Sequence, residues 1–171
     1  MKIKPEFVII HHIGGSDAYP LADTSKFTLE QLDNEHKNRF GVISSLGYYV
    51  AYNYYILQDG TLIQTRSDDE RDMDALGYNF NSTSICLQGN FDLTEPTEQQ
   101  LDTLSKLVLS KCEEYSISYE DVIFHRYIAN KTCPGANFTK KMLWYNIIRR
   151  ASFRQLLKII IAILKKEITL E

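Results

Sequence analysis

The amino-acid sequence predicts a single α/β domain, and three observations lead to that prediction. Apolar, β-branched runs bounded by turn residues, typical of strands, occur at residues 7–13, 50–57 and 83–88. Segments that begin with capping residues, typical of helices, start at residues 28 and 97. The two kinds of segment alternate along 171 residues, a length that suits one domain with its own core.

The first third of the chain contains a buried strand and a capped helix. Residues 7–13 are continuously apolar apart from two histidines and end at a Gly-Gly pair, which predicts a buried strand. Thr28 begins a helix that runs to about Arg39, because Gln31 completes a capping box. Residues 50–57, an Asp-Gly turn and the segment TLIQT then predict a hairpin.

The second half continues the alternation. An acidic loop at residues 68–74 precedes the strand at 83–88, and a long amphipathic helix follows at 97–115. Residues 121–125 form a short strand that ends at His125. Thr139 begins the last helix of the domain, and the chain from residue 151 continues or restarts it.

We divide the chain into a domain at residues 1–150 and a C-terminal extension at residues 151–171. As a helix, the extension has a broad apolar face opposite a side lined by basic residues: Arg150, Arg154, Lys158 and Lys165. Two roles are open for this extra C-terminal helix. It docks on the domain, or it lies on an anionic membrane surface as a basic amphipathic helix.

Charge is distributed unevenly along the chain. Residues 1–121 contain 20 acidic and 9 basic residues, whereas residues 122–171 contain 2 acidic and 10 basic ones. The basic end therefore either packs across the acidic body or meets an anionic surface. An acidic body without a nucleic-acid-binding motif gives no support to nucleic-acid recognition.

The three cysteines do not form a disulfide pattern. Cys86 and Cys112 lie in apolar segments and are predicted to be small buried residues. Cys133 is therefore the cysteine for which the neighbouring residues indicate a chemical role. The N-terminus lacks the pattern of a signal peptide, and no apolar run is long enough to cross a bilayer. We therefore expect synthesis in the cytoplasm without a signal peptide.

The segment HRYIANKTCPG, residues 125–135, carries the clearest chemical signal. It places His125 and Cys133 eight residues apart, and these are the residue types that zinc prefers. The segment IIHHI offers His11 and His12 as a third ligand, and a strand directs the two to opposite faces. A fourth ligand, from His12 or His36, would make the site structural instead of catalytic.

Five segments give the chain a wider resemblance. They are IIHHI, EHKNRF, AYNYYILQDGT, ALGYNFNSTSICLQGNF and HRYIANKTCPG, between residues 7 and 149. In order and spacing they resemble the zinc N-acetylmuramoyl-L-alanine amidases, the family shared by T7-lysozyme-type phage endolysins and peptidoglycan recognition proteins. The resemblance implies a central mixed β-sheet flanked by helices.

The resemblance also implies the site residues. It assigns zinc to His11, His125 and Cys133, with His11 preferred over His12 because it directly follows the apolar strand. It assigns catalytic roles to Tyr52 and Lys131.

Some positions near the predicted site leave questions open. Tyr48 and Tyr49 are rivals of Tyr52 if the local alignment slips. The chain departs from the family pattern at Asp74 and Asn53, where many members have histidine. We predict that neither is a metal ligand.

The implied activity is zinc-dependent hydrolysis of the amide bond between N-acetylmuramic acid and L-alanine in peptidoglycan. We expect a monomeric phage-type endolysin that acts on the cell wall after release. Two alternatives are a cytosolic amidase that recycles soluble muropeptides and a peptidoglycan-binding module without catalysis. Because all three ligand residues are present, the enzyme is the favoured interpretation.

Overall fold

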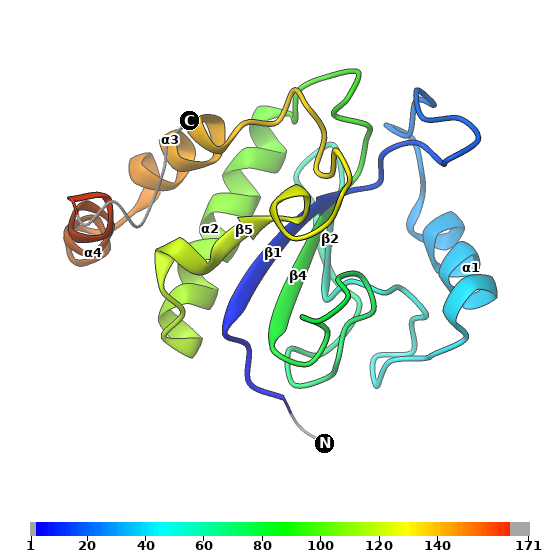
Figure 1. Cartoon of the computed structure of the whole chain (residues 1–171), viewed down its shortest axis with the longest axis horizontal. Helices are drawn as coiled ribbons and strands as arrows, with labels where there is room; N and C mark the ends of the chain where they lie inside the picture. Colours follow the sequence, from blue (N-terminus) through cyan, green and yellow to red (C-terminus); the bar gives the residue numbers. More distant parts are fainter. Residues whose placement is uncertain (1–2, 165–171) are drawn as a thin grey trace.

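The structure is a computed structural model that describes residues 3–164. Residues 1–2 and 165–171 lie outside the described part, and with them Lys165 of the predicted basic side. Figure 1 shows a central sheet with helix α1 on one side and helices α2 and α3 on the other. The predicted α/β domain with a mixed sheet is confirmed.

The sheet has five strands in the order β3-β2-β4-β1-β5. Strands β2, β4, β1 and β5 run parallel to one another, and the edge strand β3 is antiparallel to β2. The strands are β1 (Phe7–His12), β2 (Tyr54–Ile56), β3 (Leu62–Gln64), β4 (Ser82–Leu87) and β5 (Val122–Phe124). Strand β1 lies between two parallel neighbours, which explains its apolar sequence.

The predicted hairpin forms, but its first strand is shorter than the run at residues 50–57. The carbonyl oxygen of Asn53 accepts hydrogen bonds from the N–H groups of both Thr65 and Arg66, at 2.9 and 3.2 Å. Two residues therefore oppose one at this point, as in a β-bulge, and regular pairing begins at Tyr54. The β-forming residues at 50–57 give no indication of this bulge.

The capping box predicted at Thr28 is present, and the helix predicted to start at Thr97 begins with a second capping box. Helix α1 (Leu29–Phe40) is capped by Thr28 with Gln31, and helix α2 (Glu98–Tyr115) is capped by Thr97 with Gln100. These caps satisfy backbone N–H groups that have no partner within the helix. Two short 3-10 helices, η1 (Tyr119–Asp121) and η2 (His125–Tyr127), flank β5.

Two apolar clusters cover the two faces of the sheet. The larger includes Val8 and Ile10 of β1 and packs against α2 and α3. The smaller includes Tyr55 and Cys86 and packs against Leu32 of α1. Because side chains alternate along a strand, His12 points toward the larger cluster and His11 toward the α1 side.

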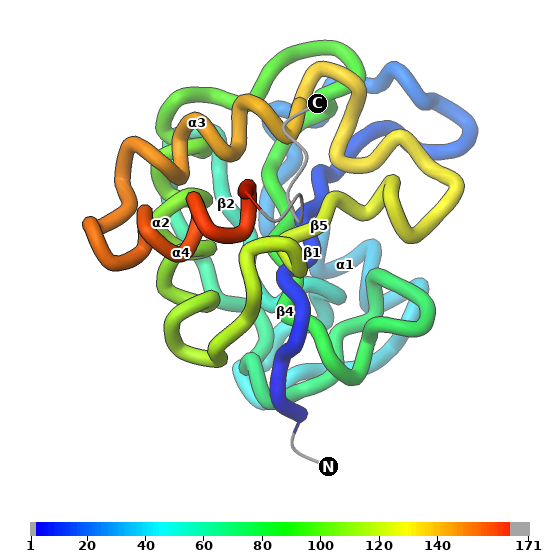
Figure 2. Tube along the Cα trace, turned by 60° about the vertical axis from the view of Figure 1, so that its left-hand side comes forward, coloured from blue at the N-terminus to red at the C-terminus, as the bar shows by residue number. Residues whose placement is uncertain are grey.

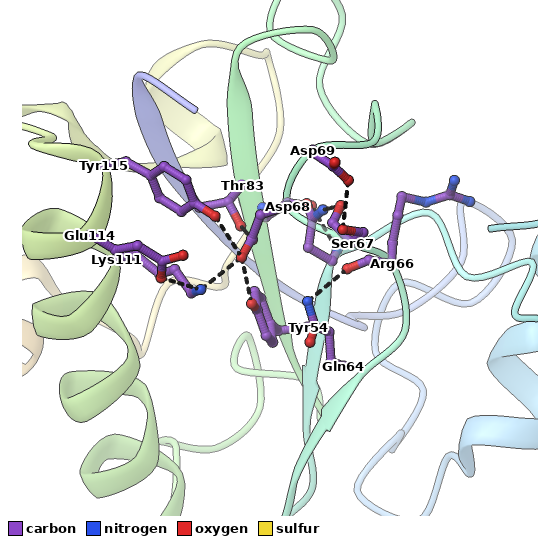
Figure 3. Close-up of polar contacts among 12 residues, drawn as sticks. Tyr54, Gln64, Arg66, Ser67, Asp68, Asp69, Thr83, Lys111, Glu114 and Tyr115 are labelled. Carbon is purple, nitrogen blue, oxygen red and sulfur yellow. Dashed lines mark hydrogen bonds and ion pairs between the residues drawn. The ribbon is translucent and has the colours of Figure 1, made fainter. Parts of the chain in front are cut away.

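The acidic loop at residues 68–74 is a loop, but its carboxylates are largely buried. Asp68 is the centre of a network in which Lys111 and Tyr54 each donate to Oδ2 at 2.7 Å and Thr83 donates to Oδ1 at 2.6 Å. Figure 3 shows these side chains converging on Asp68 from α2 and from β2 and β4. The network ties α2 to the sheet, because a buried charge requires partners.

The C-terminal helical segment restarts instead of continuing. Helix α3 (Lys140–Arg150) ends at Ala151, whose backbone is extended, and α4 (Phe153–Leu164) begins two residues later. Ser152 and Gln155 exchange hydrogen bonds across the first turn of α4 in the manner of a capping box. Among residues 3–164, no helix has the length and apolar character needed to cross a membrane.

Candidate metal centre

Two predicted ligands lie side by side because β1 and β5 are parallel neighbours. Ile10 is paired with Phe124 in the register of these strands, and His11 and His125 are the next residues along each chain. Their ring centroids are 4.5 Å apart. The topology of the sheet therefore brings together two histidines that are more than one hundred residues apart in the sequence.

Cys133 completes the group. One potential ligand atom from each of His11, His125 and Cys133 lies within 4.8 Å of the other two. The Sγ atom of Cys133 is 3.6 Å from Nδ1 of His11. Zinc binds nitrogen at about 2.0–2.1 Å and sulfur at about 2.3 Å, so tetrahedral ligands of these types stand about 3.6 Å apart. The donor types and this separation fit zinc.

The loop that carries Cys133 is fastened to the residue after His125. The Arg126 N–H donates to the Cys133 carbonyl at 2.7 Å, and the Arg126 guanidinium donates to the carbonyls of Gly135 and Phe138 at 2.7 Å each. The Cys133–Pro134 peptide bond is cis. These contacts return the loop to β5.

The far side of the same loop is held by Asp92 and Phe91. Asp92 accepts hydrogen bonds from the Thr132 hydroxyl and the Ala136 N–H, both at 2.8 Å. Gly135 has φ +99°, and a Cβ atom there would lie 2.4 Å from the carbonyl carbon of Phe91. Glycine is required at this close approach.

The other histidines have different partners. His12 accepts a hydrogen bond at Nδ1 from the Phe91 N–H at 3.0 Å, and His36 accepts one at Nδ1 from the Ala51 N–H at 2.9 Å. Neither is in the three-residue group, and no other group of this kind occurs in residues 3–164. The two candidates for a fourth ligand are therefore used elsewhere.

Electrostatics at the group favour neutral imidazoles. Burial, with the charge of Lys131 as a smaller cause, lowers the pKa of His11 to about 3. Burial, with His11 and then Lys131 as smaller causes, lowers the pKa of His125 to about 4. Neutral rings offer a lone pair to a cation.

The Cys133 thiol, unlike the imidazoles, favours its protonated form. Burial raises the pKa of the Cys133 thiol to about 12. A thiol in such surroundings keeps its proton until a cation replaces it.

Tyr52 lies beside the group. Its ring centroid is 5.1 Å from that of His11 and 5.5 Å from that of His36. Burial is the main cause that holds the pKa of its phenol well above the ordinary value, so the hydroxyl stays protonated. Tyr48 and Tyr49, the rival positions, have no comparable ring contact with His11 in the described part of the chain.

Lys131 is exposed and lies in the turn between the two later ligands. Its N–H donates to the Ala129 carbonyl at 2.8 Å. Its charge contributes to the lowered pKa values of both His11 and His125.

Asp74 makes a contact that the sequence did not reveal. Its Oδ2 atom lies 2.5 Å from Nε2 of His11, and both side chains are almost fully buried. Neither atom has a hydrogen-bond partner among the described residues, so the contact is a close approach of two buried groups. The two nitrogens of His11 therefore face different neighbours, Nδ1 toward Cys133 and Nε2 toward Asp74.

A second buried carboxylate lies beside Asp74. Burial raises the pKa of Asp72 and of Asp74, and the charge of Asp74 raises that of Asp72 further. The Ser82 hydroxyl donates to Asp72 at 2.7 Å. The acidic composition of this loop was visible in the sequence, but the burial that pairs these two acids depends on tertiary packing.

Asn53, the other departure from the family pattern, joins backbone segments. Its side-chain oxygen accepts from the Ser84 N–H at 2.9 Å, and its side-chain nitrogen donates to the Ser67 carbonyl at 2.9 Å. It is fully buried and outside the three-residue group. These two hydrogen bonds account for an amide side chain at this position.

Comparisons with known proteins bear on the family and the fold of the chain. The family described as N-acetylmuramoyl-L-alanine amidase matches residues 1–136 of the chain. Peptidoglycan-recognition protein SC2 of Drosophila melanogaster is 24% identical over 143 residues, which cover 82% of this chain and 74% of that protein. The endolysin of Escherichia phage T7 is 31% identical over 105 residues, which cover 56% of this chain and 64% of that protein.

Solved structures show the same fold. The structure of the N-acetylmuramoyl-L-alanine amidase LysC from Clostridium intestinale superposes with a TM-score of 0.68 and 26% identity, covering 86% of this chain and 85% of that one. The endolysin of the Thermus scotoductus bacteriophage Ph2119 superposes with a TM-score of 0.67 at 18% identity, covering 86% and 87%.

Proposed function

Since the chain belongs to the N-acetylmuramoyl-L-alanine amidase family, we propose that it cleaves the bond between N-acetylmuramic acid and L-alanine with zinc held by His11, His125 and Cys133. The observation that carries the assignment is the separation of 3.6 Å between Cys133 Sγ and His11 Nδ1, within a group of three donors. Three protein ligands leave one position of a tetrahedral ion open, as in catalytic zinc sites.

Asp74 orients the first ligand in this proposal. With Nδ1 directed to the metal, Nε2 of His11 carries the proton and faces the Asp74 side chain, 2.5 Å away. A carboxylate behind a zinc-bound histidine fixes the tautomer and the ring orientation and raises the basicity of the ligand.

The remaining groups act on the substrate. Zinc in such a site lowers the pKa of water to about 7 and polarises a carbonyl. Tyr52, whose hydroxyl is held in the protonated form, donates a hydrogen bond to the carbonyl oxygen of the scissile amide. The ammonium group of Lys131 compensates the negative charge that develops on that oxygen in the transition state.

The substrate class follows from the family, and we propose polymeric peptidoglycan as the target of an endolysin that works as a monomer. Support for this role comes from the likeness to the endolysin of Escherichia phage T7 and to an amidase structure at 26% identity. In this role the enzyme acts on the cell wall after its release from the cytoplasm.

Mass spectrometry of reaction products tests the activity and the substrate size together. The purified protein is incubated with intact sacculi and, separately, with a small soluble muropeptide. Release of free stem peptides from sacculi supports the endolysin role. Cleavage of the muropeptide alone supports a recycling amidase, and no cleavage of either contradicts the enzymatic assignment.

Metal analysis tests the ligand assignment independently of activity. We expect one zinc per wild-type chain and loss of zinc together with activity in Cys133→Ser. Cys112→Ser is the matched control, because Cys112 is also a free cysteine but packs in the larger apolar cluster. Retention of stoichiometric zinc by Cys133→Ser would show that this thiol is not a ligand.

A further inference from the structure

Helix α4 exposes a row of large apolar side chains that we call the apolar stripe. It consists of Phe153, Leu157, Ile160 and Leu164, which are 85%, 52%, 49% and 78% exposed. The spacing of four, three and four residues places them along one face of the helix. Single exposed apolar residues are ordinary on a protein surface, but an aligned row indicates an interaction site.

The stripe is not the side by which α4 packs on the domain. Ile159 and Ala162 are buried and belong to the larger apolar cluster, so they anchor the helix. Gln155 adds a hydrogen bond of 3.3 Å to Glu113 of α2. Helix α4 therefore has one apolar face that is buried against the domain and a second apolar face that is exposed.

Positive charge borders the stripe. Arg154 and Lys158 are exposed on one flank of α4, and Arg149 is exposed near the end of α3. Residues 122–164 contain no acidic residue. The acids that approach this region belong to α2, where Glu113 contacts Gln155 and Asp102 contacts Arg150 at 2.5 Å, and to η1, which packs against α4 and contains Glu120 and Asp121.

From this arrangement we propose that α4 binds the surface of an anionic phospholipid bilayer, with the apolar stripe inserted among the lipids. Exposed large apolar side chains beside lysine and arginine are the features of helices that lie in the plane of a membrane interface. The adjacent basic residues match anionic headgroups.

A second copy of the chain is a weaker candidate for this surface. Four partly exposed side chains of this size offer on the order of 500 Å². A stable protein–protein interface buries about 800 Å² on each partner. The stripe is therefore small for a dimer interface but sufficient for shallow insertion.

The position of α4 suits such a contact. Figures 1 and 2 show α4 outside the layer formed by α2 and α3, at the end of the molecule opposite α1. The side chain of His11 points toward the α1 side of the sheet. Contact with lipid through α4 therefore leaves the α1 side of the metal centre free.

Vesicle co-sedimentation tests the proposal with the full chain. The wild type is mixed with vesicles of phosphatidylethanolamine and phosphatidylglycerol and with neutral phosphatidylcholine vesicles. We expect binding to the anionic vesicles and at least a tenfold weaker partition for Phe153→Ser/Leu157→Ser/Ile160→Ser. The control Leu46→Ser/Leu76→Ser, which removes exposed leucines elsewhere, should bind like the wild type.

Circular dichroism and light scattering complete the test. The triple variant should keep the wild-type melting profile, because the substituted side chains are exposed, and should keep its activity on soluble muropeptide. A wild type that ignores anionic vesicles, or a triple variant that binds them equally well, overturns the proposal. A wild-type dimer that becomes monomeric in the triple variant also overturns it in favour of self-association.

Discussion

Nε2 of His11 lies 2.5 Å from Oδ2 of Asp74, and the two side chains are only 1% and 2% exposed. This contact suggests a physical role for Asp74, one of the two positions expected from the resemblance to depart from the family pattern. In the proposed zinc site the proton of His11 is on Nε2, beside Asp74, and the lone pair is on Nδ1, which faces Cys133. The departure therefore adds an orienting group to the proposed metal centre.

Replacing Asp74 should weaken zinc binding without removing it. In Asp74→Asn the amide nitrogen can donate to Nε2, which favours the tautomer with the proton on Nδ1 and blocks the ligand atom. We expect zinc affinity to fall about 10–100-fold, measured by competition with a chelator. Asp59→Asn, in an exposed turn, is the control, and an unchanged affinity in Asp74→Asn would refute the orienting role.

Lys131→Ala should separate metal binding from catalysis. The side chain is exposed and is not one of the three ligands, so the variant should keep one zinc per chain. Loss of the positive charge beside the developing oxyanion should lower kcat by about 10²–10³-fold. Lys141→Ala, an exposed lysine on α3, should leave kcat unchanged, and wild-type turnover by Lys131→Ala would show that the assigned role is wrong.

His36 should make the fold sensitive to acid. Burial, with the charge of Arg39 as a smaller cause, lowers the pKa of His36 from 6.5 to about 4. Between these values the unfolded chain binds a proton that the folded chain does not, so the free energy of unfolding falls as the pH falls from about 6.5 to 4.

His36→Asn should reduce this pH dependence. The Asn side-chain oxygen can replace Nδ1 as the acceptor of the Ala51 N–H, and it does not titrate. Urea unfolding at pH 7 and pH 4 should show a stability loss smaller by on the order of 2 kcal/mol in the variant. An equal loss in both proteins would place the acid sensitivity in other groups.

Lys111→Met should destabilise the fold strongly, because Asp68 would remain buried without its cation. The Lys111 and Asp68 side chains are 10% and 7% exposed. Removing one partner of such a buried pair lowers the free energy of unfolding by about 3–5 kcal/mol.

Lys106→Ala is the matched control, since its ion pair with Asp102 involves a lysine side chain that is 67% exposed. Its loss should cost less than about 1 kcal/mol. Urea denaturation measures the free energy of unfolding of both variants. Equal losses of stability would show that burial does not make the Lys111–Asp68 pair more important than the exposed pair.

The sequence predicted the elements whose signals are local. The capping box at Thr28, the helix start at Thr97 and the apolar run of β1 depend on neighbouring residues. Each of these elements formed within one or two residues of its expected bounds. The preference for His11 over His12 came from the resemblance, and strand alternation indicated only that the two side chains face opposite sides of the sheet.

Features that depend on contacts between distant segments were not predictable. The burial of Asp68 depends on Lys111 of α2, and the burial of Asp72 and Asp74 depends on Ser82 of β4 and His11 of β1. An acidic composition alone suggests exposure. The bulge at Asn53 depends on how Thr65 and Arg66 meet it across the hairpin. Whether α4 docks or projects was open in the sequence, and in the structure it docks by one face while exposing another.

The bonds from Arg126 to the Cys133–Phe138 segment have an entropic consequence. They are protein–protein contacts, so the loop that carries the thiol is ordered when the chain folds and does not depend on a cation for its shape. The conformational cost of bringing the thiol to the imidazoles is then part of folding, and ion capture starts from a preorganised site. Chelation should therefore yield a folded apoprotein that regains its ion without passing through the unfolded state.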